Sequence, residues 1–182
     1  MKLWKSLVVG LVSYVLLTFL ANIVFIALTG TPSFSLYFSD IWGVIVSAFT
    51  GLDGLQPVSV EIFNTIAVAV GSYPFTTGII GWLTAGASIL VPIVPGLVAA
   101  ILAGKVGKRT INGFFGMFLT GIICSVVPII IYFISPVSVA PYLSFILSEF
   151  SGTAIILTMT GVIGIFIGTF WAAIGAFFGK MD

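Results

Sequence analysis

The sequence has no histidine, one cysteine and very few charges, since only 6% of its 182 residues are Asp, Glu, Lys or Arg. Without an imidazole the chain lacks the commonest metal ligand and the one side chain that ordinarily titrates near neutral pH. The single cysteine, Cys124, cannot form an intrachain disulfide or hold an iron–sulfur cluster, and we interpret it as a small core residue. Because no nucleophile stands beside a base, we expect no catalytic residues, no metal site and no cofactor, and therefore no enzyme.

Hydrophobic residues, in contrast, make up 60% of the chain, and the mean hydropathy is +1.32. A soluble domain carries about a quarter charged residues, so water is not the main solvent of this protein. In lipid every backbone N–H and C=O needs a partner inside the protein, and the apolar runs do not alternate with polar residues as barrel strands do. The sequence therefore predicts an all-α integral membrane protein, with residues 1–182 forming a single transmembrane domain.

Four apolar segments are long enough to cross a hydrocarbon core of about 30 Å. They are Ser6–Thr29, Thr77–Gly104, Ile111–Ile134 and Thr153–Gly179. The first is longer than the apolar core of about 7–15 residues in a signal peptide, so we interpret it as a span.

The basic residues predict the orientation of these four helices, because such residues collect on the cytoplasmic side. With four spans all six fall on the same side: Lys2, Lys5, Lys105, Lys108, Arg109 and Lys180. We therefore expect a multi-pass protein of the plasma membrane with both termini in the cytoplasm.

The outer segment, residues 30–76, is apolar but interrupted by carboxylates. Ser39 or Asp40 can cap a short helix, IWGVIVSAFTGL, and GLDGLQP reads as a turn before a second, SVEIFNTIAVAV. Both runs are too short to span, so we expect interfacial or re-entrant helices. In the alternative both runs are spans, the first beginning at about Phe34 and the second ending at about Phe75, which gives six spans in total. It buries Asp40 and Glu61 at a few kcal/mol each, so four spans are favoured.

A weak internal similarity links the two halves of the chain. Thr77-Gly-Ile-Ile-Gly81 opens the second predicted span, and Thr160-Gly-Val-Ile-Gly164 lies in the fourth. Two hairpins in parallel repeat, 1–105 and 106–182, would explain this similarity, as in some transporters. Chance is the alternative, since glycine is common in membrane helices.

Glycines spaced for close helix packing occur along the last predicted span. Residues four apart clear a stripe that lets another backbone approach. The residues are Gly161, Gly164, Gly168, Gly175 and Gly179. The stripe can face a helix of the same chain or of a partner.

Two prolines, Pro92 and Pro95, followed by Gly96, interrupt the hydrogen bonding of the second span. They leave the carbonyls of Ser88 and Val91 without helical donors, so the helix bends. The freed carbonyls are either satisfied by protein groups or line a pathway for a solute, together with polar groups such as Asn22. Asn22 is also suited to a hydrogen bond between helices.

The charged residues are too few to recognise nucleic acid. Lys105, Lys108 and Arg109 can hold anionic lipid headgroups, although cytoplasmic retention explains them equally well. The outer carboxylates could bind a divalent cation, but helix caps and turns use the same residues.

Two function classes follow from the sequence. The favoured one is a non-enzymatic structural or accessory subunit that packs within a larger membrane protein complex, with lipids and other subunits, or further copies of itself, as partners. The alternative is a small transporter or channel for an ion or small solute, with the second span lining the pathway.

Overall fold

The computed structural model describes residues 2–29, 33–50, 78–140 and 153–180, without the side chains of 29, 78–92, 153–157, 159 and 163. Within these ranges the regular elements are all helices, which confirms the predicted all-helical class. The long helices are α1 (Lys2–Thr29), α5 (Gly78–Gly107), α6 (Thr110–Ile134) and α9 (Thr153–Phe178). The short helices are α2 (Phe34–Ser39), α3 (Ile41–Thr50) and α7 (Pro136–Val139).

Three stretches of these helices are long and apolar enough to cross a membrane. They are Lys2–Leu28 in α1, Thr110–Ile134 in α6 and Thr160–Phe178 in α9. In α5 the stretch Ile93–Gly107 is apolar but shorter.

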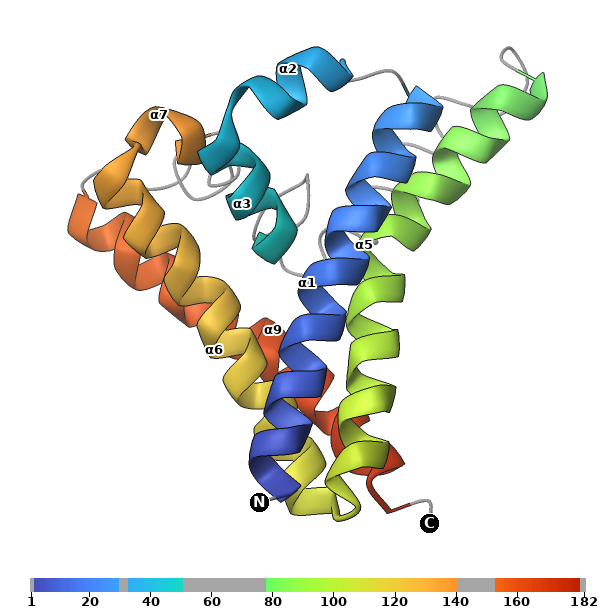
Figure 1. Cartoon of the computed structure of the whole chain (residues 1–182), viewed down its shortest axis with the longest axis vertical. Helices are drawn as coiled ribbons and strands as arrows, with labels where there is room; N and C mark the ends of the chain where they lie inside the picture. The colour runs from blue at the N-terminus through green and yellow to red at the C-terminus, as the bar shows by residue number, and fades with distance from the viewer. Residues whose placement is uncertain (1, 30–32, 51–77, 141–152, 181–182) are drawn as a thin grey trace.

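The long helices form two pairs. α1 lies beside α5, and α6 lies beside α9. The pairs meet at the end that holds both termini and separate toward the other end, where α3 lies between them (Figure 1). α3 contacts α1, α6 and α7. The division of the chain into a parallel repeat of two hairpins, 1–105 and 106–182, stays a prediction.

Small residues let the helices approach closely where the pairs meet. Ser6 of α1 donates a hydrogen bond of 2.8 Å from its Oγ to the carbonyl of Ala103 in α5. The same serine lies against Gly116 of α6, where an added Cβ would come within 2.9 Å of the Ser6 Cβ. Without a hydrophobic force between helices in lipid, such contacts supply the dispersion energy and hydrogen bonds that hold them together.

A turn of two residues joins α5 to α6. Lys108 adopts φ 53°, the left-handed conformation that ends many helices, and its N–H bonds to the carbonyl of Gly104 at 3.2 Å. α5 therefore runs three residues past the predicted end at Gly104, because the helix continues to this cap rather than stopping at the edge of the apolar run. Asn112 adds a bond from its amide to the Gly107 carbonyl at 3.0 Å.

Asp40 begins α3. Its Oδ1 accepts hydrogen bonds of 3.1 Å from the N–H groups of both Trp42 and Gly43, as an N-cap does. The second predicted outer run, SVEIFNTIAVAV, lies outside the described residues, as do Asp53 and Glu61.

Candidate functional site

A buried polar contact fixes α3 to α1. The Asn22 amide, which is fully buried, donates to the carbonyl of Ser47 in α3 at 3.0 Å. The hydroxyls of Ser47 and Tyr37, both buried, lie 2.8 Å apart, so α2 joins the same cluster. Polar side chains of this kind hold helices together in a membrane because lipid offers them no partner. Asn22 therefore acts as an interhelical donor, and its partner lies on a short helix.

Two polar atoms beside this contact have no hydrogen-bond partner among the described residues. They are the Asn22 Oδ1 and the Thr18 Oγ1, and both are buried. Residues four apart in a helix lie on one face, so the two atoms are one turn apart on α1. Leaving a buried polar group unpaired costs about 1–3 kcal/mol. The α1 face toward the cluster can thus accept a hydrogen bond from one further group.

Substituting Asn22 and Thr18 one at a time compares a side chain that makes a hydrogen bond between helices with one that makes none among the described residues. We expect Asn22→Leu to lower the free energy of unfolding by at most about 1 kcal/mol, because the lost bond to Ser47 is partly offset by removal of the unpaired Oδ1. Thr18→Val should be neutral or stabilising, since it removes a buried hydroxyl that has no partner among the described residues. Unfolding in mixed micelles measures both, and equal destabilisation would contradict the assignment.

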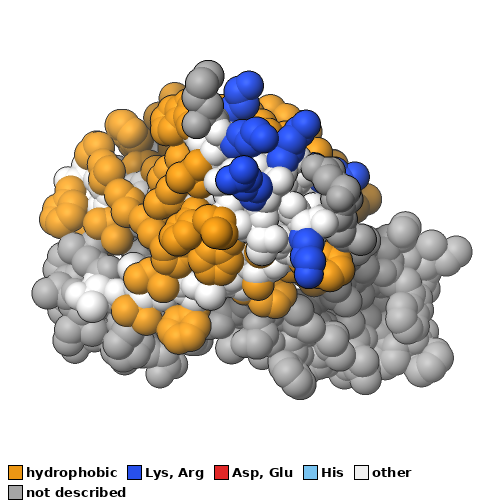
Figure 2. Space-filling view, turned by 90° about the horizontal axis from the view of Figure 1, so that it is seen from below, with side chains coloured by type: hydrophobic (Ala, Val, Ile, Leu, Met, Phe, Trp, Pro, Cys, Tyr) orange, Lys and Arg blue, Asp and Glu red, His pale blue; other side chains and the backbone are white. Residues whose placement is uncertain are grey.

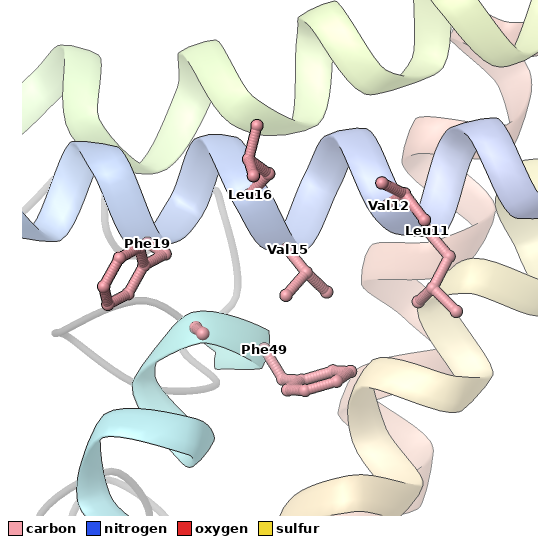
Figure 3. Close-up of a pocket in the computed structure, with 7 residues that line it drawn as sticks. Leu11, Val12, Val15, Leu16, Phe19 and Phe49 are labelled. Carbon is pink, nitrogen blue, oxygen red and sulfur yellow. The ribbon is translucent and has the colours of Figure 1, made fainter.

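An open apolar groove runs between α1 and the end of α3, with a volume of about 410 Å³. Its lining residues are Leu11, Val12, Val15, Leu16, Phe19, Ala48 and Phe49. Val15 and Phe19 point toward α3, Leu11 points past the end of α3 toward α6, and Phe49 extends from α3 beneath α1 (Figure 3). Every described side chain that lines the groove is apolar, so the groove suits a hydrocarbon ligand.

The groove lies deep relative to the basic end of α1. At 1.5 Å per residue, Val15 is about 15 Å along the helix from Lys5. Half of a hydrocarbon core is also about 15 Å, so the level of Val15 and Phe49 is that of a bilayer midplane if Lys5 marks the membrane surface. Sequence reasoning identified Asn22 but missed Ser47, Tyr37 and the groove, because nothing in the pattern says which helix a short apolar run meets.

The glycines of α9 differ in their surroundings. An added Cβ at Gly164 would overlap the side chain of Ser125. At Gly168 it would come within 3.2 Å of the Gly121 Cα, and at Gly175 within 2.9 Å of the Gly113 carbonyl oxygen.

The two ends of the glycine stripe also differ. At Gly179 an added Cβ would come within 2.8 Å of the Arg109 carbonyl oxygen, whereas none of the described atoms lies within 4 Å of such a Cβ at Gly161. The close approaches therefore begin at Gly164, and their role in helix association in a membrane stays a prediction.

The proline segment of α5 lies within a continuous helix, since α5 runs from Gly78 to Gly107. Pro95 is buried, and an added Cβ at Gly96 would overlap the Trp171 indole of α9. Asn22 bonds to Ser47 of α3, whereas Gly96 meets Trp171 of α9. The two features predicted to line a pathway therefore make separate contacts. The side chains of Ser88, Val91 and Pro92 lie outside the described residues, and the pathway hypothesis stays untested.

The basic residues gather at the end where the helix pairs meet. Figure 2 shows Lys and Arg side chains on one face at this end, with apolar side chains around them. Lys105, Lys108 and Arg109 are all exposed there. Asp40 lies at the start of α3, toward the opposite end (Figure 1). Among residues searched in the described ranges, no three Asp, Glu, His or Cys side chains gather as a metal site would require.

No protein-family model, curated protein or solved structure matches this chain. Its class therefore comes from its own fold and hydropathy. The described part is an all-helical protein with three helices that are long and apolar enough to cross a membrane.

Proposed function

We propose that this chain is a four-span protein of the plasma membrane, with both termini in the cytoplasm, that serves as a non-enzymatic subunit of a larger membrane complex. α5 supplies the fourth span. The gathering of basic residues at the end that holds both termini supports this orientation, because basic residues resist translocation.

One observation carries the subunit proposal. A row of aliphatic side chains spaced four apart runs along nearly all of α1, and each is between 38% and 58% exposed. The row consists of Val8, Val12, Leu16, Leu20, Val24 and Leu28. It carries no polar or charged side chain, and the glycines of α9 from Gly164 to Gly179 are used in contacts inside the chain. Residues four apart drift by about 40° per step around an α-helix, so one helix cannot follow the whole row. An apolar helix of a second subunit would pack along its part from Leu20 to Leu28.

Photo-crosslinking in native membranes tests the proposal. A photoreactive residue at Leu20 should crosslink to a second polypeptide that also co-purifies in stoichiometric amount in mild detergent. The matched position is Phe166 of α9, which is 73% exposed. Because the proposal places the partner on α1, this position should reach lipid alone. Lipid adducts at both positions, with no co-purifying chain, would sink the subunit proposal. Crosslinks between copies of this chain would establish a homo-oligomer instead.

The topology has its own test. Cysteines placed at Lys108 and Asp53, after removal of the buried Cys124, should react with an impermeant thiol reagent from opposite sides. Position 108 should react from the cytoplasm and position 53 from outside, as the basic residues require. Reaction of position 53 from the cytoplasm would establish six spans.

Transport is a second candidate, favoured by the two unpaired atoms at Asn22 and Thr18. A solute that donates hydrogen bonds would satisfy both. Flux of a solute through liposomes that contain only this chain, abolished by Asn22→Leu, would favour transport over the subunit role.

A further inference from the structure

The α1–α3 groove and the basic end of α1 lie on one continuous track. Lys2 and Lys5 are exposed at the start of the helix, with Trp4, 67% exposed, between them. The exposed apolar row continues from Trp4 through Val8 to Val12, which is the first of its members to line the groove. A cationic end, an apolar track and a hydrocarbon-lined groove thus follow one another along α1.

The spacing of these features matches one leaflet of a bilayer. Lys5 is about 9 Å along the axis from Leu11 and about 16 Å from Leu16. An acyl chain of one leaflet extends over about 15 Å, half of the hydrocarbon core. Trp4 is placed where aromatic residues lie at the membrane surface.

The occupant must therefore be amphiphilic, with an anionic head and a hydrocarbon chain. No acidic side chain of the described residues lies near Lys2 and Lys5, since Asp40 is toward the opposite end of the molecule. In the groove, Val15 and Phe49 offer dispersion contacts to a hydrocarbon chain that reaches the depth of the membrane core (Figure 3).

We propose that α1 and α3 form a binding site for one anionic phospholipid of the leaflet at the basic end. Its phosphate lies at Lys2 and Lys5, and the end of one acyl chain occupies the groove beside Phe49. The site requires that α1 spans the membrane. It uses the row only as far as Leu16, so it leaves Leu20, Val24 and Leu28 free for the helix of a second subunit.

Crosslinking from the lipid itself tests this site. The full chain is reconstituted in phosphatidylcholine bilayers that contain phosphatidylglycerol with a diazirine at the end of one acyl chain, and the adducts are mapped by mass spectrometry. Adducts should concentrate on residues 11–19 and 48–49. The joint variant Lys2→Gln and Lys5→Gln should lower their yield roughly fivefold for each lysine, the effect of a single basic residue near an anionic surface.

A variant that fills the groove provides the second arm. Val12→Trp should lower the yield roughly tenfold, since it displaces about two CH₂ groups of the chain from the protein surface. The matched control is Val24→Trp on the same exposed row, where valine is 53% exposed and does not line the groove. Both positions are exposed, so neither variant should disturb folding.

Three results would overturn the site. Adducts spread evenly along the row from Val8 to Leu28 would mean ordinary surrounding lipid. An equal loss with Val24→Trp would mean that the groove is not the site. An equal loss with the joint variant Lys105→Gln and Lys108→Gln, which removes the same charge elsewhere, would mean that general attraction to the basic end accounts for binding.

Discussion

Gly164→Leu is expected to destabilise the bundle by about 3 kcal/mol, the upper part of the usual cost of overpacking a core. Any side chain at this position overlaps the Ser125 side chain of α6, so α6 and α9 must separate. Contacts with lipid are no more favourable than the contacts between helices that they replace. The dispersion energy lost when the two backbones separate is therefore not compensated. Unfolding in mixed micelles, with the monodispersity of the purified protein, measures the loss.

Three variants separate this collision from a general intolerance of larger side chains. Gly161→Leu, with none of the described atoms within reach of its Cβ, and Ile165→Leu, at a side chain 49% exposed, should each cost far less. Ser125→Gly should restore part of the stability of Gly164→Leu, since it removes the atoms that collide. Equal tolerance of leucine at Gly161, Gly164 and Ile165 would mean that the stripe faces lipid.

Gly96→Leu is expected to cost about 2–3 kcal/mol through its contact with Trp171. An added Cβ would come within 2.9 Å of the indole Cδ2 and closer still to two other ring atoms. Trp171 is buried against small side chains, so the ring has little room to move. A double-mutant cycle with Trp171→Ala should give a coupling of at least about 1 kcal/mol, because the cost of leucine falls once the ring is absent.

The matched control for Gly96→Leu is Val94→Leu on the same helix, where the side chain is 41% exposed. It should change the free energy of unfolding little. An additive double-mutant cycle would show that Gly96 does not pack on Trp171. If Gly96→Leu left stability intact but impaired solute flux, this part of α5 would line a pathway, and transport would become the better proposal.

Much of the fold is predictable because the solvent leaves few choices. A chain of long apolar runs with only 6% charged residues must pair its backbone internally in lipid, so helices follow from composition. The spacing of Lys2, Lys5, Lys105, Lys108, Arg109 and Lys180 also predicts that they share one side, and the described structure gathers the basic ends of the helices at one end of the bundle. A helix start capped by Ser39 or Asp40 was also predictable, since a cap bonds the N–H groups just after it, and the structure shows that Asp40 is the one that caps α3.

The contacts between helices were not predictable in this way. A helix that is apolar all round carries no periodic signal to show which face is inside. The sequence marked Gly161 and Gly164 alike as members of one stripe, yet Gly164 meets Ser125 while no described atom lies within 4 Å of an added Cβ at Gly161. It marked Asn22 as a hydrogen-bonding group, but not Ser47 as the acceptor.

The sequence by itself thus determined the helical class, because the pairing of backbone groups in lipid depends on the composition of each segment alone. It also marked the side chains able to pack closely or to bond between helices. Only the tertiary structure decided that α3 enters the space between the helix pairs, that Gly96 meets Trp171, and that an apolar groove forms beside Phe49. These features join residues far apart in the chain. Between uniformly apolar helices, dispersion contacts select a neighbour by the fit of the two surfaces, and the local sequence pattern does not show that fit.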